Sequence, residues 1–200
     1  MAVVSNGTTL IDNGALDSGV PTGSLILLST QTASASANIS FTSGIDSTYD
    51  SYVFKFYDIH PSVDNSFFEF NLSTDSGSNY NVTKTTTFFK AQHSENDVYG
   101  SLDYMTASDL AQSTSFQQLS TNSGNDNDQS GVGTLQLFNP SSTTFIKHFI
   151  ANTNLYHFED LSMENFVAGY GNTTSAVDAV RFQMSSGNID SGTIKMYGVK

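Results

Sequence analysis

Residues 52–57 (YVFKFY) carry an aromatic side chain at every second position. Tyr52, Phe54 and Phe56 would share one face of a β-strand, because side chains of a strand alternate between its two faces. The residues between them are Val, Lys and Tyr, which are also largely apolar. The segment therefore predicts a strand that is packed on both faces.

Similar signals recur along the rest of the chain. Alternating apolar residues, and runs rich in β-branched and aromatic residues, are typical of strands. They predict strands at residues 35–41, 67–72, 82–89, 132–138, 145–151, 167–170, 177–184 and 193–199. Clusters of Gly, Asn, Asp and Ser separate these segments, and such residues favour chain reversal.

Helical periodicity is nearly absent from the sequence. Residues 102–119 are the exception, because residues 109–112 are compatible either with one short helix or with a loop. A parallel βαβ fold would need crossover helices, which no segment supplies. We therefore expect an all-β fold, an antiparallel β-sandwich of eight to ten short strands with jelly-roll-like connections, over residues 24–200.

Residues 1–23 differ from the rest in having small and polar residues, Pro21 and no aromatic residue. A globular segment of this length usually contributes a side chain to the core. Two interpretations stay open: an extended N-terminal arm laid on another molecule, or a disordered terminus. The expected organisation is thus an arm over residues 1–23 and a sandwich domain over residues 24–200.

The composition excludes several classes of protein. The 200 residues carry a net charge of -12, yet only 13% are charged, and the 7 cations are too few and too dispersed for a nucleic-acid footprint. No apolar run approaches the roughly 20 residues that span a bilayer, and the first residues lack the pattern of a secretory signal. The absence of Cys excludes disulfides and thiolate metal sites. Because the chain has 15 Phe and 9 Tyr, it can form a core.

One loop has part of a calcium-binding pattern. Residues 126–131 (DNDQSG) place oxygen-bearing side chains at alternate positions before a Gly, as in the first half of an EF-hand loop. The bidentate Glu required at the twelfth position is missing, because Leu137 stands there. A solvated turn is the favoured interpretation, and we assign no metal ligand.

Catalytic and metal-binding patterns are not found. The four His residues, His60, His93, His148 and His157, have no helical metal-ligand spacing. There is no G-x-S-x-G elbow and no phosphate-binding loop, and the four Glu residues lack a partner motif. The sequence predicts a protein that is not an enzyme, with no catalytic residue, no cofactor and no metal.

Carbohydrate binding is a further alternative, because β-sandwiches often bind sugars. Sugar platforms favour exposed aromatic residues, above all Trp, and the chain has none. The tyrosines that could substitute are Tyr49, Tyr80, Tyr99 and Tyr104. Sequons for N-glycosylation occur at Asn6, Asn38, Asn71, Asn81 and Asn172, a number expected by chance in a chain this rich in Asn, Ser and Thr.

Several segments carry a resemblance to a known family. They are residues 41–49 (FTSGIDSTY), 52–61 (YVFKFYDIHP), 73–89 (STDSGSNYNVTKTTTFF), 109–114 (DLAQST), 137–145 (LFNPSSTTF) and 189–198 (IDSGTIKMYG). With their surroundings, over residues 25–199, they resemble virion structural proteins of marine tailed bacteriophages. That family offers no catalytic motif to carry over.

The resemblance implies a non-enzymatic structural protein on the exterior of the capsid or the tail. The first expectation is a capsid decoration (cement) protein docked through its arm on the major capsid protein or another virion protein, as a homotrimer. The alternative is a tail-associated fibre or adhesin protein that binds the host surface. Neither implies nucleic-acid binding or membrane insertion, and net negative charge suits a protein kept soluble at high copy number.

Overall fold

The computed structural model describes residues 2–5, 7–12, 15–16 and 25–200. These residues form strands and turns without a helix, and every strand pairing is antiparallel. None of them belongs to a helix that could cross a lipid bilayer. The expected all-β sandwich is confirmed, and its jelly-roll-like connectivity stays a prediction.

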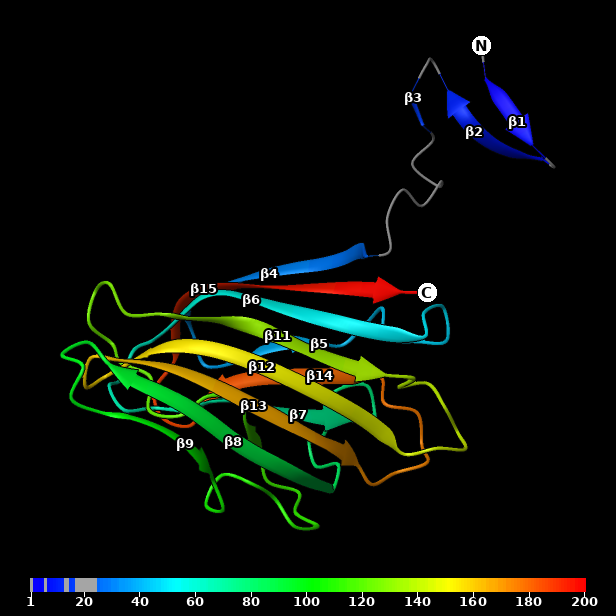
Figure 1. Ribbon diagram of the computed structural model, residues 1–200. Helices are drawn as coiled ribbons and strands as arrows, with labels where there is room; N and C mark the ends of the chain where they lie inside the picture. The colour runs from blue at the N-terminus through cyan, green and yellow to red at the C-terminus, as the bar shows by residue number, and fades with distance from the viewer. Residues whose placement is uncertain (1, 6, 13–14, 17–24) are drawn as a thin grey trace.

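Two sheets form the sandwich (Figure 1). The larger has the order β4 (Ile26–Ser36), β15 (Ile189–Val199), β6 (Ser51–Pro61), β11 (Gly131–Phe138), β12 (Lys147–His157), β13 (Leu161–Gly171), β8 (Lys84–Ser94) and β9 (Gly100–Tyr104). The smaller has the order β10 (Gln117–Gln118), β7 (Phe68–Ser73), β14 (Ala179–Met184) and β5 (Ile39–Phe41). Strands are longer than the sequence predicted, since six of them have 11 residues.

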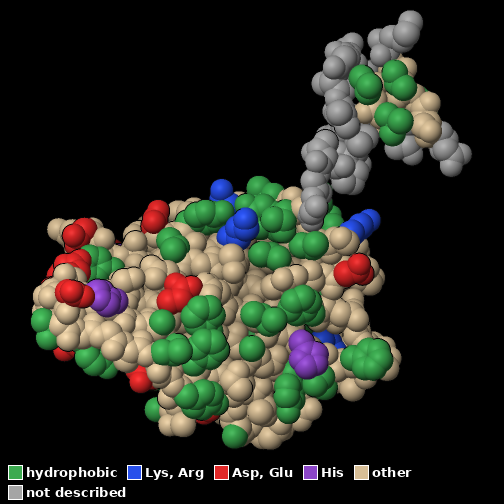
Figure 2. All heavy atoms as spheres, in the orientation of Figure 1, with side chains coloured by type: hydrophobic (Ala, Val, Ile, Leu, Met, Phe, Trp, Pro, Cys, Tyr) green, Lys and Arg blue, Asp and Glu red, His purple; other side chains and the backbone are tan. Residues whose placement is uncertain are grey.

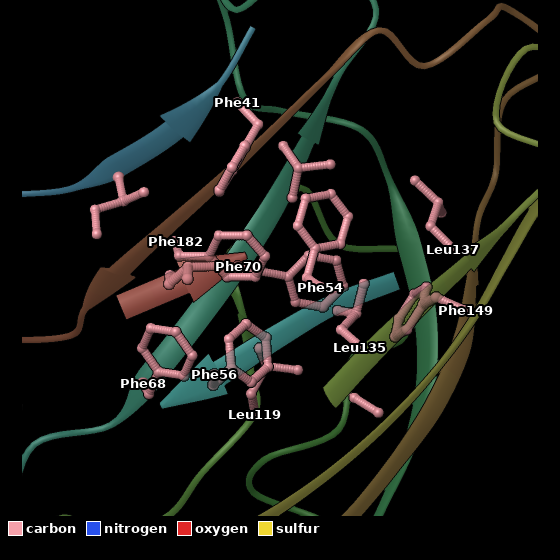
Figure 3. Packing of buried hydrophobic residues seen from close by; sticks show 14 of the residues in the cluster. Phe41, Phe54, Phe56, Phe68, Phe70, Leu119, Leu135, Leu137, Phe149 and Phe182 are labelled. Carbon is pink, nitrogen blue, oxygen red and sulfur yellow. The ribbon is translucent and has the colours of Figure 1, made fainter. Parts of the chain in front are cut away.

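The core lies between these two sheets. The ring of Phe182 on β14 is 5.3 Å from that of Phe54 on β6, and the ring of Phe70 on β7 is 4.9 Å from that of Phe149 on β12 (Figure 3). All four side chains are buried. Because burying one such side chain contributes roughly 1.5–3 kcal/mol, these inter-sheet contacts hold the sandwich together.

The prediction that residues 52–57 are packed on both faces was wrong. Tyr52, Phe54 and Phe56 are buried, whereas Tyr57 is exposed. The second sheet covers only the inner face of β6, and the other face is on the outer surface of the eight-stranded sheet. Antiparallel sheets commonly have one face packed and one solvated.

Residues 35–41 are not one strand as predicted. The chain leaves β4 after Ser36 and enters β5 at Ile39, which belongs to the other sheet. Ala35 has a φ of 48°, a left-handed conformation that interrupts regular strand geometry. The segment therefore carries the chain from one layer of the sandwich to the other, and Ala35 and Ala37 are exposed there.

The loop alternative for residues 109–112 is correct. After β9 the amide groups of Ser108 and Asp109 donate to the carbonyl oxygen of Met105 at 3.0 and 3.2 Å, and no helix continues from this turn. Further along, the amide group of Leu110 donates to the hydroxyl of Thr86 at 2.7 Å. Leu119 is fully buried, so the loop also contributes to the core.

The first residues form a small sheet of their own, from β1 (Val3–Ser5), β2 (Thr8–Asp12) and β3 (Ala15–Leu16). Within the described ranges these three strands pair only with one another, and Figure 1 shows them apart from the sandwich. The described part of the expected arm is thus a short β-structure. Residues 1, 6, 13–14 and 17–23 of that expected arm lie outside the described residues, as does residue 24 of the expected sandwich domain.

Candidate interaction surfaces

The loop at residues 126–131 is closed by a side chain of its own. The amide of Asp126 donates to Oε1 of Gln129 at 3.1 Å, and the amide of Gln129 donates to the carbonyl oxygen of Asp126 at 2.9 Å. Gln129 is buried and Leu137 is in the core. The favoured interpretation as a turn agrees with this geometry. No group of three metal-ligating side chains occurs in the described part of the chain.

The four His residues lie at separate places. Nδ1 of His60 is 2.7 Å from the carbonyl oxygen of Gln129, and Nε2 of the exposed His93 is 3.1 Å from Oδ1 of Asp97. His148 is exposed beside the ring of Tyr170 on the outer face. His157 is buried, which lowers its pKa, and its Nδ1 accepts a hydrogen bond from a backbone amide. The four His side chains thus have separate partners and do not share one site.

One carboxylate and one tyrosine have pKa values that their surroundings shift. Burial raises the pKa of Glu69, whose Oε1 accepts a hydrogen bond from Gln183 at 2.8 Å. A hydrogen bond with Glu95 raises the pKa of Tyr156 to about 12, with smaller contributions from desolvation and from Asp160. Glu95 and Tyr156 line an open hollow together with Asp128. Figure 2 shows acidic side chains gathered at this end of the molecule.

The candidate sugar-binding tyrosines do not form one platform. Tyr49 packs against Tyr52 with ring centroids 5.9 Å apart, and Tyr80 lies under the guanidinium of Arg181 at 4.0 Å. Tyr99 and Tyr104 are exposed near the β8–β9 hairpin.

The sequons also differ in their surroundings. Asn71 is fully buried, so the folded chain does not offer it for glycosylation. Asn38, Asn81 and Asn172 are exposed, and Asn6 lies outside the described residues.

Two buried lysines were missed by the sequence analysis. Lys84 on β8 and Lys147 on β12 both lie beside Gly171 of β13 in the strand register, on the inner face. Nζ of Lys84 donates to Oδ1 of Asn71 at 2.5 Å and to the carbonyl oxygen of Val82 at 2.9 Å. Desolvation lowers the pKa of Lys84 to about 7 and also lowers the pKa of Lys147.

Lys147 and Lys84 bind loop carbonyl groups at the same end of the sheet. Nζ of Lys147 donates to the carbonyl oxygens of Phe145 and Thr173 at 2.6 and 3.2 Å. Asn71 in turn donates to the carbonyl oxygens of Tyr80 and Thr114 at 2.7 and 2.9 Å. We interpret both lysines as structural, because both are fully buried and each ammonium group donates two hydrogen bonds that tie a strand to a neighbouring segment.

The outer face of the eight-stranded sheet carries exposed apolar side chains (Figure 2). Phe166 of β13 stacks on Phe89 of β8, with ring centroids 4.8 Å apart and an interplanar angle of 12°. Tyr104 of β9 is paired with Phe89 in the strand register. Nearer to β4 this face also carries a cation beside an aromatic ring, because Nζ of Lys55 lies 5.5 Å from the ring centroid of Tyr197.

The two edges of the eight-stranded sheet differ sharply. β9 has five residues and includes the charged Asp103. β4 has 11 residues, with the sequence ILLSTQTASAS, and contains neither a charged residue nor a proline. Short strands, charges and prolines are the usual means by which proteins prevent pairing at an edge. The edges of the smaller sheet, β10 and β5, have only two and three residues.

Comparison with protein-family models, with curated proteins and with solved structures finds no match to this chain. The candidate surfaces must therefore be judged from their own geometry.

Proposed function

We propose that this chain is a non-enzymatic bacteriophage virion structural protein, a capsid decoration (cement) protein docked on the outer shell through residues 1–23. The observation that carries the proposal is the separate small sheet formed by β1, β2 and β3. Val3 and Val4 are 49% and 56% exposed there, although their strand pairs only within the small sheet among the described residues. Such apolar strands gain stability when another molecule covers them.

Other properties support the same role. The sandwich has a core of its own, so the first residues are free to serve attachment. The net charge of -12 keeps many copies soluble and discourages contact with packaged nucleic acid. Because the sequence resembles virion proteins, we propose the virion as the assembly. The partner would be the major capsid protein or another virion protein. We further propose a homotrimer, which a mass measurement in solution would test.

The test compares the full chain with a variant that lacks residues 1–23. Both are added to virions stripped of the protein, and bound copies are counted after sedimentation. The truncated chain should keep its circular dichroism spectrum and thermal transition but should lose binding. Full occupancy by the truncated chain would refute attachment through this segment.

The second candidate is a tail-associated fibre or adhesin protein that contacts the host surface. The β8–β9 hairpin favours it, because Val98 and Leu102 are 82% and 71% exposed and Tyr99 lies beside them in sequence. Copy number separates the two roles, since a shell protein would occur in hundreds of copies per virion and a tail protein in about 6 to 18. A glycan array with the purified chain would test sugar recognition by this hairpin.

A further inference from the structure

β4 is an open edge along its regular part. From Ser29 to Ser34 it pairs with β15 without a register shift, and the single irregularity of this pairing lies at Leu28. Among the residues that the structure describes, no strand pairs with the opposite side of β4. An edge of this length that lacks charge and proline is a template for pairing with a further strand.

Side-chain contacts show which backbone groups point away from β15. The hydroxyl oxygens of Thr32 and Thr193 are 3.3 Å apart, which fits the close side chains of a non-hydrogen-bonded pair. In such a pair the N–H and C=O groups of both residues point away from each other. The amide of Ser34, two residues on, donates to the hydroxyl of Ser36 at 3.1 Å. Thr30 and Thr32 therefore present free backbone groups at the outer edge.

The small sheet of β1, β2 and β3 offers an edge strand for pairing with β4. Its order is β1-β2-β3, so β1 is an edge as well. Its pairings cover only three residues between β1 and β2 and two between β2 and β3. Ribbons this small are marginal in water without further packing. β1 has the sequence VVS and carries no charge, so it meets an uncharged β4 without repulsion.

We propose that β1 of a second copy of this chain pairs with β4 and extends the eight-stranded sheet across the subunit boundary. This pairing keeps the β1–β2 ladder intact and covers the backbone groups of Thr30 and Thr32. It also places the exposed Val3 and Val4 of β1 within a continuous sheet. Each copy offers β1 as a donor strand and β4 as an acceptor edge, so exchange around a closed ring pairs both of these edges in every copy.

The inference rests on the proposed role of residues 1–23 in assembly, because it names a neighbouring copy as their acceptor. Strand exchange between copies and attachment to the shell can nevertheless be refuted independently of each other. Strand exchange is measured between purified chains in solution, whereas attachment to the shell is measured with virions. Chains that exchange strands but do not bind virions would refute only the proposed function.

The absence of Cys from the chain makes thiol cross-linking specific to introduced residues. Two differently tagged full-length chains, one with Val4→Cys and one with Thr30→Cys or Thr32→Cys, are mixed and mildly oxidised. We expect a disulfide-linked heterodimer at several times the yield of a control mixture of Val4→Cys with Thr134→Cys, an exposed position on the central strand β11. A yield equal to the control would overturn the proposal.

A second measurement tests the hydrogen bonds of the edge. Thr32→Pro removes one outward N–H group, whereas Thr32→Val keeps that group and serves as the matched control. Light scattering should give an oligomer for the unchanged chain and for Thr32→Val, and a monomer for Thr32→Pro with an unchanged circular dichroism spectrum. If Thr32→Pro fails to fold, the cross-linking result alone decides. Oligomers that persist without residues 1–16 but dissociate with Thr32→Pro would mean that two β4 edges pair directly, which overturns the proposal.

Discussion

The two faces of the eight-stranded sheet arise from the same strands but have different surroundings. On β12, Phe149 is 1% exposed and its ring meets Phe70 of the other sheet, while its neighbour Ile150 is 57% exposed on the outer face. Both residues are large and apolar. What stabilises the fold is therefore the second layer of the sandwich, which desolvates only the inner face. The apolar side chains of the outer face are available for contacts with other molecules.

The largest expected effect is on the inner face. Phe182→Ala would remove a ring that lies within 6.4 Å of the rings of Phe41, Phe54 and Phe70. Because the cavity is surrounded by both sheets, we expect the free energy of unfolding to fall by about 3–5 kcal/mol. Urea denaturation would measure the change. A loss below 1 kcal/mol would contradict the view that this face carries the stability.

A second prediction concerns the buried cation on the inner face. The pKa of Lys84 is about 7 in the folded chain and about 10.4 in an unfolded chain, so the unfolded state binds more protons between these values. Its contribution to stability therefore rises with pH in that window, by about 2 kcal/mol between pH 7 and pH 9. Well below pH 7 the lysine is protonated in both states, and its contribution no longer changes.

The variant Lys84→Met should abolish this rise, because methionine does not titrate and fills a similar volume. Denaturation of both chains at pH 7, 8 and 9 would measure the difference in slope. Lys55→Met on the outer face is the matched control, and it should keep the slope of the unchanged chain. Equal slopes for Lys84→Met and the unchanged chain would refute a depressed pKa for Lys84.

A smaller effect is expected from the stacked pair on the outer face. Phe166→Ala would remove a ring that is half-buried against Phe89, so we expect a loss of about 0.5–1.5 kcal/mol. The same truncation at Phe182 provides the comparison between faces. If both variants lost equal stability, the two faces would contribute equally.

The smallest effect should come from the cation at the solvent-exposed face near β4. Lys55→Gln would remove the contact between an ammonium group and the ring of Tyr197, which is worth roughly 0.5–1 kcal/mol at an exposed site. The loss should shrink in 1 M salt, because exposed charges are screened. Thermal denaturation at low and high salt would measure it, and a salt-independent loss would point to packing instead.

The sequence predicted the fold class because aromatic alternation is a strong local signal, as at Tyr52, Phe54 and Phe56. It failed at residues 35–41, where Ala and Ser alternate without showing which face is buried. It could not place Lys84 inside, because the acceptor Asn71 lies thirteen residues away on the other sheet. The sequence also could not predict that β4 is an edge strand, because the place of a strand in a sheet depends on the order in which distant strands pair.

The connection of β4 to both layers has a mechanical consequence. Residues that precede β4 join it at Ile26, and after Ser36 the chain passes into β5 of the smaller sheet. A tensile force applied through the first residues and directed along β4 would load its hydrogen bonds to β15 together, in shear, instead of opening them one by one. β5 would then transmit the remaining tension into the second layer, so the sandwich would resist extraction as a unit.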